Sequence, residues 1–217
     1  MADKEFAQER ERMITGQLKS RGIKDPRVLA AFDEIPRHLF CLENERISAY
    51  RDFPQPIGYN QTISQPYVVA LMTECLRLTG TERVLEVGTG SGYQAAILSC
   101  LAAEVHTIEI IPELAETSHK PIDLLNISNI HFHIGDGSLG FQGAAPYDGI
   151  LVSAAAPKVP RPLMDQLIDG GRLILPVGTR GYQQLELWQR IGDSYNSHVI
   201  IPVAFVPLRG KFGWDKS

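Results

Sequence analysis

The most restrictive feature of this sequence is a regular alternation of short apolar segments and longer amphipathic segments between residues 83 and 176. The apolar segments predict strands at 83–87, 105–110, 130–134, 150–153 and 172–176. The amphipathic segments predict helices at 93–102, 112–126 and 162–168. Strands that alternate with helices form a parallel sheet that is covered on both faces. The central part of the chain therefore belongs to the α/β class.

The sequence before this alternation predicts helices and loops. A helix is expected over 26–35, with Asp25 as N-cap and Pro26 as the first helical residue, and another over 66–78. Between them, residues 51–65 are rich in Pro, Gly and polar residues, which predicts a long loop of the kind that often carries function.

The sequence after the alternation predicts a different local structure. Two β-rich segments, 183–191 and 198–206, are separated by residues that include the turn dipeptide Gly192-Asp193. This pattern predicts an antiparallel hairpin that completes the sheet. We therefore expect a single domain over residues 1–217, with a helical and loop cap (1–65), a cofactor-binding α/β core (66–180), and a C-terminal hairpin with a substrate-side tail (181–217).

Composition narrows the class of protein. Hydrophobic residues make up 44% of the 217 residues and charged residues 21%, which is typical of a globular chain. The net charge of −4 argues against a nucleic-acid partner, because Lys and Arg supply much of the affinity for phosphates. The apolar stretch 95–103 is shorter than the roughly 20 residues that a membrane helix needs, and the N-terminus resembles no signal peptide. Cys41, Cys75 and Cys100 form no C-x-x-C pair, so we expect no disulfide framework and a cytoplasmic location.

A glycine-rich segment, VLEVGTGSGY at 84–93, joins a predicted strand to a predicted helix. Glycines at such a turn permit a tight bend and let a ligand approach the backbone closely. Tyr93 stands where the dinucleotide fingerprint requires a third Gly or Ala, so the loop fits S-adenosyl-L-methionine better than a nicotinamide cofactor. The residues predicted to contact this cofactor are Glu86, Gly88, Thr89, Gly90, Ser91 and Gly92.

Acidic residues follow at the ends of the next two predicted strands. Glu109 lies about twenty residues beyond the glycines, where a carboxylate accepts hydrogen bonds from ribose hydroxyls. Asp136, between Gly135 and Gly137, is expected to meet the adenine amino group together with Gly137, although a turn alone also favours Gly-Asp-Gly.

The sequence offers little support for methylation of nucleic-acid bases or for a metal site. Methyltransferases that act on amino groups of nucleic-acid bases carry Asp or Asn followed by Pro-Pro and an aromatic residue, and the segment 153–157, SAAAP, lacks this motif. It also lacks the Pro-Cys pair of enzymes that attack a pyrimidine ring. His131 and His133 occupy alternate positions of one predicted strand, but no carboxylate or cysteine completes a ligand set, so we predict a structural role and no metal site.

Several segments together resemble the protein-L-isoaspartate O-methyltransferase family. They are QTISQP (61–66), the glycine loop, APYD (145–148) leading to AAAP (154–157), and LIDGGRLILPVG (167–178). The closing FVPL (205–208) extends the likeness over nearly the whole chain.

This resemblance implies a fold and a reaction. The fold is a doubly wound, mostly parallel sheet of the class I S-adenosylmethionine-dependent methyltransferase type, with an antiparallel C-terminal hairpin and an N-terminal helical extension. The reaction is transfer of a methyl group from S-adenosyl-L-methionine to the free α-carboxylate of L-isoaspartyl residues in damaged proteins and peptides. A carboxylate is already ionised at neutral pH, so no general base is needed. The implied acceptor-site residue is Ser64, with Ile63, Val206 and Leu208 as peptide-binding residues.

Several alternatives remain open at this level. Ser64 also fits a helix N-cap, because it precedes Gln65-Pro66 and an amphipathic run. The chain as a whole also fits a methyltransferase for a small-molecule carboxylate or hydroxyl, or for RNA, and a non-catalytic S-adenosylmethionine-binding module. A nicotinamide oxidoreductase is disfavoured by Tyr93 and by the hairpin. We expect a monomer with neither nucleic acid nor membrane as a partner.

Overall fold

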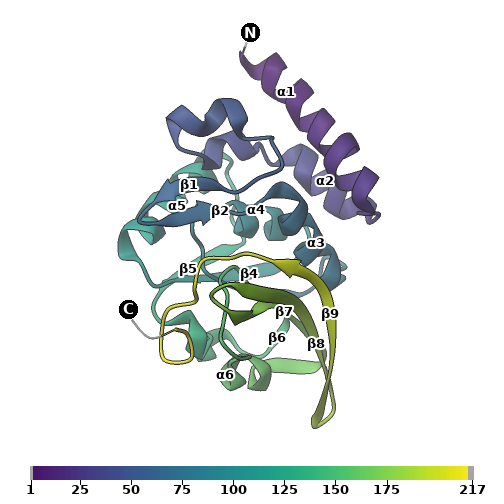
Figure 1. The fold of residues 1–217 in the computed structure, drawn as a ribbon, viewed down its shortest axis with the longest axis vertical. Helices are drawn as coiled ribbons and strands as arrows, with labels where there is room; N and C mark the ends of the chain where they lie inside the picture. Colours follow the sequence, from purple (N-terminus) through teal and green to yellow (C-terminus); the bar gives the residue numbers. More distant parts are fainter. Residues whose placement is uncertain (1, 215–217) are drawn as a thin grey trace.

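The computed structural model describes the backbone of residues 2–214 and the side chains of residues 6–214. A seven-stranded sheet forms the centre, in the order β5-β4-β3-β6-β7-β8-β9 (Figure 1). Its strands are β3 (Arg83–Val87), β4 (Glu104–Glu109), β5 (Ile130–Ile134), β6 (Tyr147–Val152), β7 (Leu167–Thr179), β8 (Tyr182–Ile191) and β9 (Ser194–Val203). Neighbours from β5 to β7 are parallel, whereas β8 and β9 are added antiparallel. Because strands are added on both sides of β3, the sheet is doubly wound, as the sequence predicts.

Helices cover the two faces of this sheet. The larger apolar cluster contains side chains from α2 (Pro26–Glu34), α3 (Pro66–Leu76), α4 (Tyr93–Ser99) and α5 (Pro112–Leu124). The short helix α6 (Arg161–Asp165) contributes to a second cluster with β6 and β7. Val84 belongs to the first cluster and Leu85 to the second, because successive side chains of a strand point to opposite faces.

Residues that precede α3 form the predicted N-terminal extension, which lies at the top of Figure 1 and packs against α3, α4 and α5. It contains α1 (Ala2–Met13), a π-helical segment (Ile14–Leu18), α2 and short 3-10 helices at Lys19–Arg21, Arg37–Phe40 and Glu43–Ser48. The Asp25 carboxylate caps α2 by accepting a hydrogen bond from Arg27 N, as expected. The predicted long loop contains a small antiparallel sheet of β1 (Gln55–Gly58) and β2 (Gln61–Ile63).

The predicted elements of the core are confirmed, but several of their boundaries are in error. β3 and β5 have the predicted bounds, whereas the helix predicted over 162–168 ends at Asp165. The reason is that Leu167 already pairs with Tyr147 of β6, and Tyr147 N donates to Gln166 O at 2.8 Å. β7 therefore begins before Gly170-Gly171 and includes both glycines. Pro121 lies inside α5, which ends at Leu124 rather than 126.

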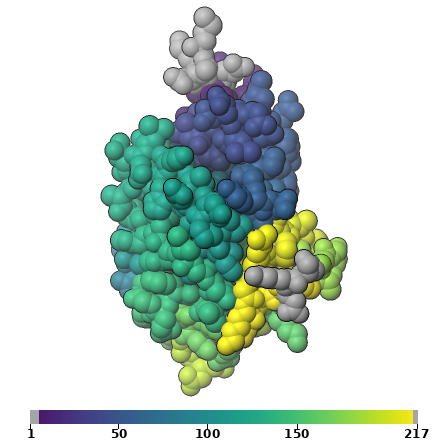
Figure 2. All heavy atoms as spheres, turned by 90° about the vertical axis from the view of Figure 1, so that its left-hand side faces the viewer, coloured from purple at the N-terminus to yellow at the C-terminus, as the bar shows by residue number. Residues whose placement is uncertain are grey.

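The C-terminal hairpin is also confirmed, but its second strand is displaced. A tight turn with Gly192 at φ +58° allows β9 to begin at Ser194 rather than at 198. Residues after Val203 then leave the sheet and return to its carboxyl end, where Lys211 N donates to Asp136 Oδ2 at 2.7 Å. Figure 2 shows this tail in yellow against the teal residues of the central region. Among the described residues, none of the helices has the length and apolarity needed to cross a bilayer.

Candidate cofactor and acceptor site

A cavity lies where the chain reverses its strand order, at the carboxyl ends of β3, β4 and β6. It has an empty volume of about 760 Å³, part of which is open to solvent. Its walls come from β2, the glycine turn, the ends of β4 and β6, and the C-terminal tail. Ligands of doubly wound sheets bind in such a crevice. The predicted cofactor residues that line it are Glu86, Gly88, Thr89, Gly90, Ser91, Glu109 and Gly137.

The glycine turn has the backbone that its sequence predicts. Gly88, Gly90 and Gly92 have φ of +93°, +54° and +86°, a region that side chains with a Cβ rarely occupy. Gly92 does not line the cavity; a Cβ there would lie 3.1 Å from Ser118 O of α5. Its hydrogen atom thus permits close packing of α5 behind the turn.

Glu109 is held in place by the backbone around it. Its Oε2 accepts from Gly90 N at 2.9 Å, while Oε1 accepts from Ile110 N at 2.9 Å and Ile111 N at 3.0 Å. The carboxylate is buried yet lines the cavity. A carboxylate oriented in this way can accept further hydrogen bonds from hydroxyl groups of a ligand.

Glu86 is fully buried at the base of the same cavity. Its Oε2 accepts from Thr107 Oγ1 at 2.6 Å, and Oε1 has no hydrogen-bond partner among the described residues. Burial raises the pKa of Glu86 to about 8; the Thr107 hydrogen bond opposes this rise, and the negative charge of Glu109 adds to it. A buried oxygen without a partner is costly unless a ligand supplies a donor. S-adenosylmethionine carries an ammonium group, hydroxyls and an amino group, so its donors fit these two carboxyl groups.

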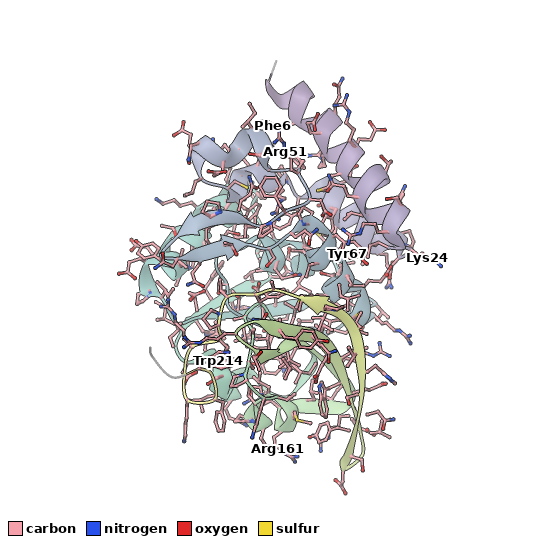
Figure 3. All side chains as sticks on the ribbon, in the orientation of Figure 1. Phe6, Lys24, Arg51, Tyr67, Arg161 and Trp214 are labelled. Carbon is pink, nitrogen blue, oxygen red and sulfur yellow. The ribbon has the colours of Figure 1, made fainter. Side chains whose placement is uncertain are left out.

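Asp136 does not line the cavity. Its Oδ1 accepts from Ser138 N at 2.9 Å and caps a short 3-10 helix (Gly137–Leu139), while Oδ2 holds the backbone of Lys211. The adenine contact of Asp136 stays a prediction, and the structure adds a second role as an anchor of the C-terminal tail. Trp214, labelled in Figure 3, secures the same tail by donating from Nε1 to Ala155 O at 2.9 Å.

A second cavity, with an empty volume of about 1020 Å³, opens beside the first. It is lined by α3 residues such as Tyr67 (labelled in Figure 3), by Pro54, and by the end of β9 and the segment that follows it. The residues that line both cavities are Thr62, Ser64, Ser153 and Val206. Ile63 is buried and, like Leu208, lines the first cavity alone. Ser64 therefore lies where the contents of the two cavities would meet.

The N-cap interpretation of Ser64 is wrong. The N-cap of α3 is Gln65, with Pro66 as the first helical residue, and no side chain caps this helix. The tail near Val206 is also fixed, because Ala155 N donates to Val206 O and Leu208 N donates to Ala155 O, each at 2.8 Å. Part of the strand edge expected to hold a peptide is thus already paired.

Arg37 is a residue that the sequence analysis missed. It is fully buried, its Nε donates to Ala49 O at 2.8 Å, and its Nη2 donates to Ser64 O at 2.7 Å. Its guanidinium also lies 4.9 Å from the centre of the Tyr93 ring. Arg37 therefore fixes the backbone at Ser64. Its only sequence signal is a cation among apolar neighbours, which gives no hint of its partner 27 residues later.

The statement that no carboxylate accompanies the histidines of β5 is also wrong. Glu104 and His106 lie on the neighbouring strand, and Glu104 Oε1 is 3.1 Å from His106 Nε2 and 3.3 Å from His131 Nε2. Burial lowers the pKa of His106 and of His133. The missed signal was an E-x-H segment beside an H-x-H segment, whose alignment depends on strand register.

The fold together with the two carboxyl groups and the glycine turn defines a class: this is a class I S-adenosylmethionine-dependent methyltransferase. Two solved structures share the architecture over most of the chain. A protein-L-isoaspartate O-methyltransferase is 30% identical with a TM-score of 0.85, over 94% of this chain and 67% of that one. A protein from Plasmodium falciparum, described as a putative protein-L-isoaspartate O-methyltransferase in complex with S-adenosyl-L-homocysteine, is 26% identical with a TM-score of 0.76, over 91% and 96%.

Sequence comparisons specify the family. The family model for protein-L-isoaspartate(D-aspartate) O-methyltransferase matches residues 8–213. A protein-L-isoaspartate O-methyltransferase from Methanoregula boonei is 52% identical over 95% of both chains. One from Shewanella sediminis is 53% identical, over 94% of this chain and 84% of that protein. The chain belongs to the protein-L-isoaspartate(D-aspartate) O-methyltransferase family.

Proposed function

We propose that this protein transfers a methyl group from S-adenosyl-L-methionine to the free α-carboxylate of L-isoaspartyl residues in damaged proteins and peptides. The observation that carries this proposal is the junction of two cavities at Ser64, one of them bounded by the glycine turn and the other partly open to solvent. The family membership and the resemblance of the TIS segment at 62–64 support the same acceptor.

The residues divide between the two substrates. In the proposal, Glu109 accepts hydrogen bonds from the ribose, Glu86 receives a donor of the cofactor, and the glycine turn admits the cofactor close to the backbone. The other proposed cofactor residues are Thr89, Ser91, Gly92, Asp136 and Gly137. Ile63, Val206 and Leu208 are proposed to contact the peptide.

Bound S-adenosylmethionine supplies an electrophilic methyl group on a sulfonium. The protein then needs to hold the acceptor oxygen in line and to exclude bulk water, rather than to remove a proton. The Ser64 hydroxyl is proposed to donate to one oxygen of the acceptor carboxylate. Arg37 would preserve that geometry, because it ties the Ser64 carbonyl to the buried core.

The proposal also includes the location, the oligomeric state and the partners of the protein. We infer a cytoplasmic monomer that acts on isoaspartyl proteins and has no nucleic-acid partner; the net charge of −4 supports this last point. In this view residues 1–65 cap the site, residues 66–180 bind the cofactor, and residues 181–217 supply the acceptor side.

The test compares an isoaspartyl peptide with its normal aspartyl counterpart, using labelled S-adenosylmethionine. We expect base-labile label in the isoaspartyl peptide alone. Label in neither peptide, with the cofactor still bound, would overturn the proposed acceptor.

The role of Ser64 is tested separately. Ser64→Ala should lower kcat/KM for the isoaspartyl peptide by about tenfold to a hundredfold, the effect of losing a hydrogen bond to a charged group. Cofactor affinity should change by no more than a few-fold. The control is Ser197→Ala, at an exposed position of β9 that lines neither cavity. Full turnover by Ser64→Ala would remove the hydroxyl from the mechanism.

A further inference from the structure

A cluster of metal-ligating side chains lies on the face of the sheet opposite to Glu86 and Glu109. Glu104 and His106 project from β4, and His131 and His133 project from β5, the strand at the sheet edge. His106 pairs in register with His131, so the two imidazoles stack with their centres 4.9 Å apart. Phe141 stacks on His133, with the two ring centres 3.7 Å apart.

The distances within the cluster are those of a metal site. Glu104 Oε1 lies 3.1 Å from His106 Nε2 and 3.3 Å from His131 Nε2, and all three atoms lie within 4.8 Å of one another. Ligand atoms that each lie about 2.1 Å from a tetrahedral zinc ion are about 3.4 Å apart. Small side-chain adjustments would therefore place all three atoms around one ion.

His106 provides an independent reason to expect a cation. Its side chain is 8% exposed, and its Nε2 makes no hydrogen bond of standard geometry with the described residues, although Glu104 Oε1 lies 3.1 Å away. Its other nitrogen, Nδ1, lies 3.0 Å from His133 Nε2. When Nδ1–H donates to His133, the lone pair of Nε2 faces the Glu104 oxygen, and a cation between them removes the repulsion.

The atoms of Glu104 and His106 that would not contact the ion are held by hydrogen bonds, as is usual in metal sites. A metal-bound histidine usually donates its other N–H to a fixed acceptor, which His133 provides for His106. Glu104 Oε2 accepts from Arg83 Nε at 2.7 Å, so Arg83 orients the carboxylate and leaves Oε1 facing the two imidazoles. His131 is 49% exposed, which leaves room for water as a fourth ligand.

We propose that Glu104, His106 and His131 bind one divalent transition-metal ion, with zinc as the natural choice and His133 as a positioning residue. Two imidazoles, one carboxylate and a water are an established zinc ligand set. Glu104 precedes Glu109 by five residues, about 17 Å along the strand, and its side chain points to the other face. The ion would thus join β4 to the edge strand β5 without contacting the cofactor cavity.

Calorimetric titration of zinc into the untagged, chelator-treated full chain tests the proposal. We expect saturable binding of one ion per chain and a rise in Tm with added zinc, because a ligand that binds only the folded state stabilises it. Cobalt in place of zinc should give the intense visible absorption of a tetrahedral site.

Variants assign the site to these side chains. His131→Ala should weaken zinc binding at least tenfold and abolish the zinc-dependent rise in Tm, and His133→Ala should weaken binding by about tenfold. His131 is half exposed, so its replacement keeps the test valid even if a variant of buried His106 fails to fold. The matched controls are His198→Ala, on exposed β9, and Cys100→Ser, at an exposed cysteine.

Either of two results would overturn the proposal. One is the absence of saturable zinc binding, which would leave the cluster as contacts between side chains without a metal ion. The other is binding that His131→Ala leaves unchanged or that either control abolishes, which would assign the metal to other side chains.

Discussion

The two faces of β4 carry polar clusters that are built in different ways. On one face, Thr107 and Glu109 join Glu86 beside the glycine turn, and three backbone amides hold the Glu109 carboxylate. On the other face, Glu104 and His106 contact His131 of β5 through side chains alone. The first cluster depends on where strands end, and the second depends on how two strands are aligned.

This difference has an energetic consequence. Backbone amides at a strand end are fixed by the fold, so the carboxylates beside them are preorganised for a ligand before it binds. Side chains that meet across a register pair are held only by other side chains, so an ion is expected to order them. Substitutions on the first face should therefore change the affinity for the cofactor, and substitutions on the second face should change the binding of a metal ion.

The largest expected effect belongs to Glu109→Gln. An amide can replace only one of the carboxylate oxygens, and its NH₂ group would face N–H donors of the backbone. Affinity for S-adenosylhomocysteine, measured by calorimetry, should fall by about 1–3 kcal/mol, roughly five- to 150-fold. Glu113→Gln, at an exposed position of α5, is the matched control. Unchanged affinity in a folded Glu109→Gln protein would remove Glu109 from the site.

Gly137→Ala should act on the packing at the same end of the sheet. The added Cβ would lie 2.6 Å from Val87 Cγ1 and 3.0 Å from Ile108 Cγ2, two β-branched side chains that move little. The free energy of unfolding should fall by about 1–3 kcal/mol in a urea titration. Gly16→Ala, whose Cβ would meet nothing within 4 Å, should cause no such loss. Equal stability of the two variants would contradict this account.

Glu86→Gln should change the pH dependence of stability. The folded protein keeps the Glu86 proton from about pH 4.5, where the unfolded chain releases it, up to its raised pKa of about 8. The wild type therefore loses stability as pH rises through this window, by at most about 1.4 kcal/mol for each pH unit. Urea titrations across this range should show a shallower loss for Glu86→Gln. Parallel curves would mean that Glu86 is ionised in the folded state.

The smallest expected effect is that of His131→Ala without metal. Its ion pair with Glu104 is partly exposed, and such pairs contribute little. The free energy of unfolding should change by no more than about 0.5 kcal/mol in chelator. A loss above about 1 kcal/mol would show that this face stabilises the fold by itself and would weaken the contrast between the two faces of β4.

Much of the fold could be predicted from local sequence. The bounds of β3 and β5, the N-cap of α2 and the C-terminal hairpin all follow from patterns of a few residues. The end of the helix predicted over 162–168 was wrong, because pairing of Leu167 with Tyr147 outweighs local helix preference after Asp165. Local preference is a weak term that tertiary pairing overrides.

The sequence by itself determined the parts of the site that lie at strand ends. Parallel strands place their carboxyl ends at one edge of a sheet, so Glu86, the glycine turn and Glu109 had to lie close together once the alternation was recognised. These positions require no knowledge of strand register or of the loops above the sheet.

Only the tertiary structure decided the remaining contacts. Arg37 reaches Ser64 O, Asp136 holds Lys211, and His106 aligns with His131 across separations of 27, 75 and 25 residues. Each contact depends on the burial of a loop, the return of the tail or the register of two strands. These are set by packing of the whole chain, because a shift of one residue in register would turn the same side chains to the opposite face.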